Sequence, residues 1–335
     1  MLKPRLKNRK NKALLLLALC FLSACGPDKE AELPALCRLE TYAFDGARDL
    51  ASRIGPAPDN ILNYYRQSDG RADYAAYAPS GPEKALALEY LRLLPPVYEK
   101  VFRERCIGIY FMSGFMGNGA TSWVIGAGDQ VYFYIVLNPA SLKAGLSATL
   151  TERERSCFIP VPGWEISVDA GKKYRGLLYA LFHEGTHGLD YAAGITPYTD
   201  EGMPAKYFPP VPVAGKFFYS AWDSYSRPNR AFDFPGRDRI TFYGLGGGPK
   251  LRADEAPALY AGLAGTGFAS LYGARSWAED LAELETFGLI TGKLGQPYVI
   301  TLRSPSRKYI FRPMDGQAGV RAKEALAFLD EVRSE

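Results

Sequence analysis

Apolar and polar residues follow several different patterns along this chain. Between Glu83 and Arg105, leucine, tyrosine, valine and phenylalanine recur at helical spacing, and Pro95 and Pro96 interrupt them, which predicts two consecutive helices. From Cys106 the pattern changes to β-branched and aromatic runs, CIGIYFM, SWVIGAG and VYFYIVLN, separated by glycine-rich turns. These runs predict two or three strands of a small sheet between about residues 106 and 138.

More helices are predicted downstream. TERE, residues 151 to 154, fits a capping box that starts a short helix. Asp169 is a candidate cap for a long helix over about residues 172 to 193, which stops near Gly194. Further helices are predicted from Ala256 to about residue 263, over about residues 276 to 290 and over about residues 319 to 333, and YVITL and KYIFR predict a hairpin before the last.

Residues 195 to 250 have little periodicity and many prolines, glycines and aromatic residues, as in YFPPVPV and GLGGGP. So long an irregular segment in a compact domain is either a functional lid or substrate-binding insertion, or a poorly ordered surface insertion. The elements together predict an α+β protein. It would have a helical region at about residues 37 to 105 and a second domain at about residues 106 to 335 that contains the insertion.

The beginning of the chain has the pattern of an export signal. Six basic residues precede the apolar run ALLLLALCFL, which is too short to span a bilayer stably. LSAC, residues 22 to 25, resembles the lipobox of bacterial lipoproteins, which implies cleavage after residue 24, a lipid on Cys25 and a short polar tether over residues 25 to 36. An uncleaved anchor or a plain secretory signal is the alternative. Residue 26 is Gly and not Asp, which by resemblance to enterobacterial sorting favours the outer membrane, facing the periplasm.

Removal of this leader changes the charge balance. The whole chain has 40 basic and 36 acidic residues and a net charge of +4. All six basic residues of the leader are lost with it and no acidic residue is, so 34 basic residues remain and the net charge becomes about −2. The mature chain therefore has no basic surplus for binding nucleic acid.

Three cysteines remain after the leader and Cys25: Cys37, Cys106 and Cys157. In an oxidising compartment two of them can form a disulfide and leave one free, and the sequence does not select the pair. Their spacing lacks the paired clusters of a structural zinc site.

The only two histidines of the chain lie in HEGTH, residues 183 to 187. On a helix, His183 and His187 are one turn apart on the same face, so both can point a ring nitrogen at one metal ion. Glu184 is rotated by about 100° from His183, beside the metal, where it can take a proton from a water molecule. The alternative is an accidental pair on a partly buried helix. A di-iron bundle needs two Glu-x-x-His motifs, and this chain has one.

A catalytic zinc ion takes three protein ligands and one open position. Since the histidines are exhausted, the third ligand should be a carboxylate. SWAEDLAELETF supplies Glu279 and Glu283, which again share one helix face. We assign Glu279 as the ligand and Glu283 as the carboxylate that orients a histidine; the alternative is that both only solvate an exposed face.

HEGTHGLD together with LYGARSWAEDLAE resembles the gluzincins related to anthrax lethal factor and the Mlc titration factor A peptidases. The resemblance is at motif level and covers about residues 172 to 290. It implies a zincin-like fold, and a glutamate ligand seven residues after a tyrosine, a spacing that Tyr272 and Glu279 have. Tyr272 would then donate to the oxyanion of the reaction; the alternative is that it only packs. Asp190 would fix an imidazole tautomer or cap the helix.

The sequence therefore predicts a lipid-anchored, Zn²⁺-dependent peptidase of the cell envelope, with a peptide or protein as substrate. VYFYIVLN is the candidate edge strand along which an extended substrate pairs. Two alternatives stay open: a peptidoglycan amide hydrolase, and an envelope lipoprotein that holds zinc without turnover.

Overall fold

The structure is a computed structural model that describes residues 32–210 and 220–332. The predicted leader at residues 1–24, the lipidation site Cys25 and the first part of the tether lie outside these described residues. Within them, no helix is both long enough and apolar enough to cross a membrane.

The described chain is a mixed α+β structure, as predicted. The helices are α1 (Asp59–Ser68), α2 (Gly81–Leu91), α3 (Pro96–Arg105), α4 (Ala140–Lys143), α5 (Leu146–Arg155), α6 (Gly176–Ala193), α8 (Ala256–Ala264), α9 (Trp277–Gly288) and α10 (Gln317–Val332). The strands are β1 (Ile54–Pro56), β2 (Ala75–Ala76), β3 (Cys106–Ser113), β4 (Gly119–Ile125), β5 (Val131–Leu137), β6 (Phe158–Ile159), β7 (Glu165–Asp169), β8 (Trp222–Ser224), β9 (Arg227–Pro228), β10 (Leu251–Arg252), β11 (Val299–Arg303) and β12 (Lys308–Phe311).

The largest described sheet confirms the strands predicted between residues 106 and 138. Its order is β1-β3-β5-β4, with β2 paired to β3, and only β4 and β2 run antiparallel to their neighbours. The region at residues 37–105, predicted to be helical, contributes β1 and β2 to this sheet besides its helices. It therefore shares a sheet with the chain that follows residue 106.

The prediction that VYFYIVLN is an edge strand is wrong. This segment forms β5, which pairs with β3 on one side and with β4 on the other, so its backbone groups are used within the sheet. The reason lies in its side chains: Phe133, Ile135 and Leu137 enter one core and Tyr134 and Val136 enter the other. A strand buried on both faces belongs in the interior of a sheet. On this side of the described sheet the edge strand is β4.

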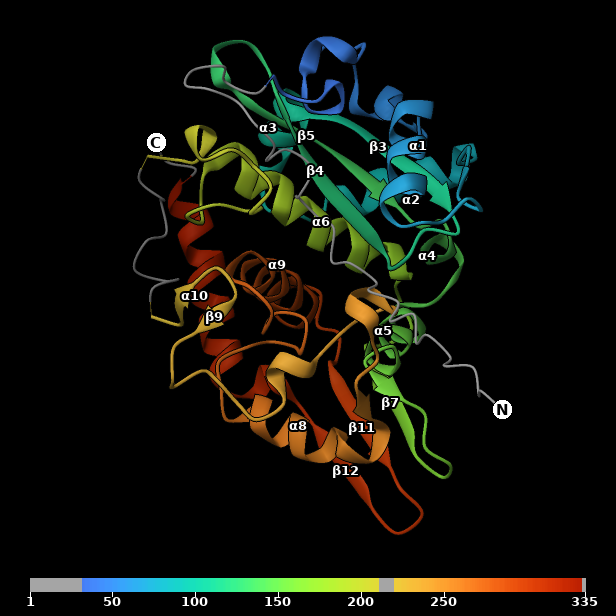
Figure 1. Ribbon diagram of the computed structural model, residues 1–335, viewed down its shortest axis with the longest axis vertical. Helices are drawn as coiled ribbons and strands as arrows, with labels where there is room; N and C mark the ends of the chain where they lie inside the picture. Colours follow the sequence, from blue (N-terminus) through green and yellow to red (C-terminus); the bar gives the residue numbers. More distant parts are fainter. Residues whose placement is uncertain (1–31, 211–219, 333–335) are drawn as a thin grey trace, which may run out of the picture.

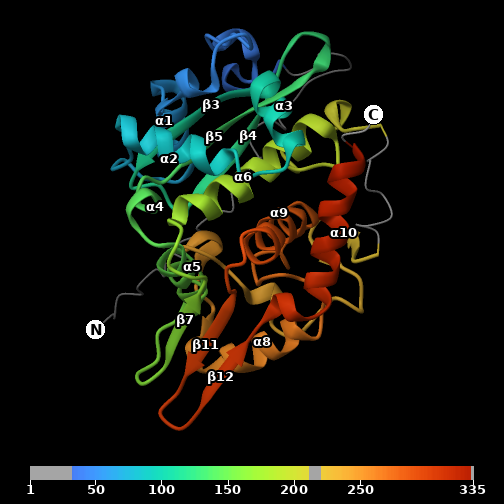
Figure 2. The same cartoon turned by 180° about the vertical axis from the view of Figure 1, so that it is seen from behind.

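The two faces of the sheet are covered by different helices (Figures 1 and 2). The helices α2, α3 and α6 pack on the face that presents Phe133, and α1 covers the other face with Ile61, Leu62 and Tyr65. The predicted break at Pro95 and Pro96 is confirmed, because α2 ends at residue 91 and α3 begins at residue 96.

The long helix α6 is shorter at its N-terminus than predicted. It begins at Gly176, and Asp169 is not its cap, because Asp169 ends β7 opposite Val299. The carboxylate of Asp169 instead accepts a hydrogen bond from the backbone N–H of Gly171, where a φ of 79° turns the chain. The C-terminal prediction is confirmed: Gly194 ends the helix in the left-handed conformation, with a φ of 63°.

The predicted capping box TERE is also wrong. These residues lie inside α5, which begins five residues before Thr151. The hydroxyl of Thr151 accepts a hydrogen bond from the backbone N–H of Val168 in β7, so the side chain joins helix to strand and caps nothing. In the last turn of this helix Arg153 and Glu154 are buried, whereas Glu152 and Arg155 are exposed.

A second group of elements packs on the other side of α6 (Figure 1). The helix α9 contacts both α6 and α10, and β7, β11 and β12 form an antiparallel sheet that contains the predicted hairpin. The helices predicted near residues 256, 276 and 319 correspond to α8, α9 and α10. The helix α6 therefore lies between the two sheets, and both parts of the protein contact it.

The three described cysteines, Cys37, Cys106 and Cys157, are free thiols, so the predicted disulfide is not present in the structure. Cys106 is the first residue of β3 and Cys157 follows α5, and both are buried in the core. Burial raises the pKa of the Cys106 thiol to about 12, which keeps it protonated and unreactive.

Candidate metal centre

The two histidines of α6 face one point. His183 is 3% exposed, and its Nε2 lies 3.2 Å from Nε2 of His187, one helical turn further on. Glu279, from α9, completes a group whose three ligand atoms lie within 4.8 Å of one another. These three residues are the group that can hold a metal ion, and they are the three that the sequence assigned as ligands.

The carboxylate of Glu279 faces the two imidazoles. Its Oε2 is buried without a well-formed hydrogen bond, and it lies 3.1 Å from Nε2 of His183 and 3.4 Å from Nε2 of His187. Burial raises the pKa of Glu279, but the two imidazoles outweigh burial and the net direction is downward. Two imidazole nitrogens and an ionised oxygen that converge in this way suit a divalent cation.

Local structure explains the position of Glu279. Ser276 caps α9, and its hydroxyl accepts a hydrogen bond from the backbone N–H of Glu279. Glu279 is therefore in the first turn of the helix, where the helix dipole favours a negative charge. The indole of Trp277 donates to the carbonyl of Tyr198, which joins the same turn to the insertion.

Glu283 binds the other nitrogen of His183. Its Oε1 lies 2.9 Å from Nδ1 of His183 and accepts a second hydrogen bond, of 2.7 Å, from the hydroxyl of Tyr179. Burial raises the pKa of Glu283, but the Arg153 guanidinium and His183 outweigh it and bring the pKa to about 2. The ionised Glu283 accepts a hydrogen bond from Nδ1–H of His183. Burial lowers the pKa of His183, but Glu279 and Glu283 outweigh it and raise the pKa to about 10. A metal ion would have to displace the Nε2 proton, and the bond at Nδ1 would then leave the lone pair on Nε2, which faces Glu279 and His187.

Glu184 lies beside this group at the bottom of the pocket. It is 6% exposed, and its Oε2 accepts a hydrogen bond of 2.8 Å from the hydroxyl of Thr121 on β4. Burial raises the pKa of Glu184, and the neighbouring imidazoles and Thr121 offset only part of this rise. A carboxylate with a raised pKa is a better proton acceptor than one in water.

Tyr272 also lines the pocket. Its ring lies 5.3 Å from the ring of His183, and burial together with the charge of Glu279 raises its pKa well above the usual value. The phenol therefore keeps its proton and can donate a hydrogen bond.

Asp190, in contrast, makes its described hydrogen bonds to two threonines and not to either histidine. Its carboxylate accepts hydrogen bonds from the backbone and hydroxyl of Thr196, both at 2.7 Å, and from the hydroxyl of Thr199 at 2.9 Å. Of the two predicted roles, the structure favours the one at the helix end: Asp190 ties the chain that leaves α6 back onto the helix. These hydrogen bonds position the first residues of the 195–250 segment, part of which lines the pocket.

The glycines of the motif are explained by close packing. A Cβ on Gly188 would lie 2.4 Å from the ring of Phe133, so α6 approaches β5 more closely there than any other residue would permit. Similarly, a Cβ on Gly119 would lie 2.8 Å from Cγ of Glu184, which brings β4 against the pocket. At Gly185 the nearest atom, of Phe102, would be 3.2 Å away, so a side chain there is nearly tolerated.

The ligand group opens into a pocket of about 190 Å³. Residues 119–121 of β4 form one wall, and Thr199, Asp200 and Tyr225 of the predicted insertion form another. Among the described residues, no lysine or arginine lines this pocket. Part of the 195–250 segment therefore lies at the candidate site, which agrees with the interpretation of that segment as a lid or substrate-binding insertion.

The sequence interpretation missed several residues of the site. Arg153, Thr121, Ser270 and Asp200 come from four separate segments, and no local motif marks them. Tyr179 is different: it precedes His183 by four residues, so helical spacing alone places it on the ligand face.

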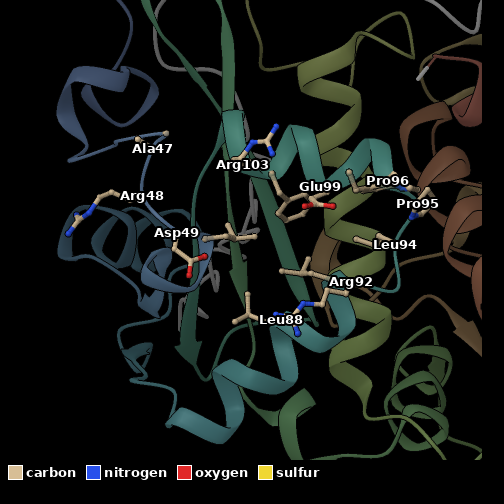
Figure 3. A pocket seen from close by; sticks show the side chains of 15 residues that line it. Ala47, Arg48, Asp49, Leu88, Arg92, Leu94, Pro95, Pro96, Glu99 and Arg103 are labelled. Carbon is tan, nitrogen blue, oxygen red and sulfur yellow. The ribbon is translucent and has the colours of Figure 1, made fainter. Parts of the chain in front are cut away.

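A larger pocket, of about 480 Å³, lies away from this site between α2, α3 and the chain around Asp49 (Figure 3). Its lining mixes leucines and prolines with Arg48, Arg92 and Glu99. Phe102, at its floor, packs against Gly185 on the back of α6. This pocket contains none of the candidate ligands.

Comparisons of the chain with protein-family models, with curated proteins and with solved structures gave no match. The function is therefore inferred from the geometry of the site.

Proposed function

We propose that this protein is a zinc-dependent peptidase of the gluzincin type, with His183, His187 and Glu279 as the zinc ligands. The observation that supports this proposal best is the convergence of these three ligand atoms within 4.8 Å, with the carboxylate of Glu184 in the same pocket. Two nitrogens and one carboxylate oxygen are a ligand set typical of catalytic zinc. Zinc supplies a lowered pKa of bound water and polarises the carbonyl of the substrate.

The protein's own residues move the protons. Glu184 takes the proton of the attacking water and delivers it to the leaving amine, a role that its raised pKa suits. Tyr272 donates to the oxygen that gains charge, since its phenol stays protonated. Glu283 fixes the ring of His183 through Nδ1.

The substrate is proposed to pair with β4. This strand is antiparallel to β5, and within residues 32–210 and 220–332 no other strand pairs with its outer edge, while its first residues line the pocket. A bridge between Ile125 and Arg38 occupies its far end. An extended peptide that adds to this edge would pass directly beside Glu184. The antiparallel edge strand, the HExxH helix and the following glutamate helix together fit a zincin-like domain.

The location proposed with this function is the bacterial cell envelope. The lipobox-like LSAC implies a lipid on Cys25 and attachment to the outer membrane, with the enzyme facing the periplasm. The tether ends near residue 36, and Arg38 already lies against β4, so the anchor is close in sequence to the substrate edge.

The test is Glu184→Gln in the purified protein. We expect zinc content to be unchanged and hydrolysis of a peptide library to fall about 10²–10⁴-fold, because glutamine cannot accept the proton. Chelation of the metal from the wild type should abolish the same hydrolysis, and zinc should restore it.

Two outcomes would contradict the proposal. Hydrolysis that survives Glu184→Gln unaltered would refute the general-base role. Wild-type protein that binds zinc and cleaves neither peptides nor the amide bonds of peptidoglycan would support the non-catalytic lipoprotein instead.

A further inference from the structure

We propose that Arg153 is a positioning residue of the metal centre: it holds Glu283 against His183 and thereby fixes the histidine as a ligand. This inference rests on the metal site of the proposed function, and nothing in the HExxH motif or the glutamate helix points to it. Arg153 comes from α5, which is distant in sequence from both ligand helices.

The contact is buried and specific. Arg153 is 1% exposed, and its Nη1 donates a hydrogen bond of 2.7 Å to Oε2 of Glu283. The other oxygen of Glu283 is the one that accepts from Nδ1 of His183. The carboxylate of Glu283 thus connects the guanidinium of Arg153 to the imidazole of His183: Oε2 bonds the guanidinium and Oε1 bonds the imidazole.

The guanidinium itself is fixed by its surroundings. Its Nε and Nη2 donate to the same oxygen of Glu154, at 3.0 and 2.6 Å. Nη1 also donates to the hydroxyl of Tyr179, at 2.7 Å, and the group lies over the rings of Tyr179 and Phe287. Because its position is set independently of the metal ligands, Arg153 can impose an orientation on Glu283.

Glu283 has all its acceptor positions in use. Oε1 accepts from His183 and Tyr179, and Oε2 accepts from Arg153 and from the hydroxyl of Ser270. Without the guanidinium, Oε2 loses its charged donor and two buried carboxylates lose their counter-charge. The carboxylate of Glu283 is then held only by the neutral hydroxyls of Tyr179 and Ser270. It therefore fixes Nδ1 of His183 less firmly, and Nε2 is aimed less precisely at the ligand point.

The same helix α9 offers a control for a purely structural role. Asp280 is fully buried, and Arg321 of α10 binds it through two hydrogen bonds, of 3.0 and 2.6 Å. This pair resembles the Arg153–Glu283 pair in chemistry and burial, and the hydrogen bonds described for its side chains join it to Trp222 and Gly267 and to none of the candidate ligands. Loss of either arginine should destabilise the fold, because an unpaired buried carboxylate is costly.

The experiment measures zinc affinity by chelator competition, together with unfolding in urea. We expect Arg153→Gln to lower zinc affinity about 10–100-fold, the usual effect of removing a group that orients a ligand. Arg153→Lys keeps the charge and should recover part of this loss. Arg321→Gln and Arg321→Lys should lower stability but leave zinc affinity within about twofold of the wild type.

If Arg153→Gln does not fold, Arg153→Lys is compared with Arg321→Lys instead, since the lysine keeps the charge but cannot reproduce all the bonds of the guanidinium to Glu154, Tyr179 and Glu283. Cobalt-loaded protein gives a second readout: its d–d spectrum should change with Arg153→Lys and not with Arg321→Lys.

The inference is overturned if Arg153 and Arg321 variants lose stability alike while zinc affinity stays unchanged in both. That result would leave the proposed function intact as long as the wild type binds zinc and hydrolyses peptides. Wild-type protein that binds no zinc would overturn both.

Discussion

The bond between Thr121 and Glu184 provides a direct test of how the pocket tunes its base. The hydroxyl of Thr121 lies 2.8 Å from Oε2 of Glu184 and 2.9 Å from the backbone oxygen of the same residue. Thr121→Val removes the hydroxyl and keeps the β-branched shape that suits a strand. We expect the variant to fold. As the pH is lowered, it should lose hydrolysis at a higher pH than the wild type does.

The direction follows from the charge state. A donated hydrogen bond stabilises the ionised carboxylate and lowers the pKa of Glu184, while burial raises it. Removal of the donor therefore raises the pKa further, and the base becomes protonated at a higher pH as the solution is acidified. The acid limb of the profile of kcat/KM against pH should therefore move to higher pH.

The size of the shift follows from the geometry. A hydrogen bond to a charged group contributes about 1.5–3 kcal/mol, and about 1.4 kcal/mol corresponds to one pH unit. The single hydroxyl proton of Thr121 is shared between two acceptors at nearly equal distances, so the lower end applies. We therefore expect a shift of about one pH unit.

The assay is kcat/KM for one peptide substrate as a function of pH, with zinc content measured in each sample. Thr121→Ser, which keeps the donor, should restore the wild-type limb. Ser122→Ala is the matched control, because its hydroxyl lies on the other face of β4, 3.1 Å from the hydroxyl of Tyr65. An unmoved limb in Thr121→Val, or an equal shift in Ser122→Ala, would refute the reasoning.

Two further predictions concern the helix and the substrate. Gly188→Ala should destabilise the protein by about 1–3 kcal/mol more than Gly185→Ala in urea unfolding, because an added methyl meets the nearest ring at 2.4 Å instead of 3.2 Å. Equal values would show that α6 adjusts freely, since the helical preference for alanine is the same at both positions. In a peptide library, lysine or arginine near the scissile bond should be favoured over glutamate, because carboxylates and no described lysine or arginine line the pocket. Asp200→Asn should reduce this preference by about two- to fivefold. A preference unaffected by Asp200→Asn would mean that this carboxylate does not face the substrate.

The positions of the candidate ligand residues were predictable because periodicity along a helix determines which side chains share a face. His183 and His187 lie one turn apart on α6, and Glu279 and Glu283 lie one turn apart on α9. The spacing within two short segments thus predicts which helix face carries each of these four side chains. The one step that spacing does not predict is that the two helices pack together.

Errors arose where tertiary pairing decides the outcome. The pattern of VYFYIVLN indicates a strand, but an edge and a centre are distinguished only by which strands flank it, and those come from residues 106–113 and 119–125. Likewise, Asp169 has the residue type of a helix cap, and its pairing with Val299, far along the chain, keeps it in β7. Local preference was overruled by a long-range partner in both cases.

Arg153 shows why the outer part of such a site escapes sequence analysis. Its neighbours along the chain, TERERS, have the composition of an exposed charged helix end. Nevertheless Arg153 and Glu154 are buried together, because Glu283 and Tyr260 supply partners from other helices. A charge is retained in a core only when such partners exist. The bond of 2.7 Å from the buried Arg153 therefore favours the ionised form of Glu283, in which one oxygen accepts from the guanidinium and the other can orient His183.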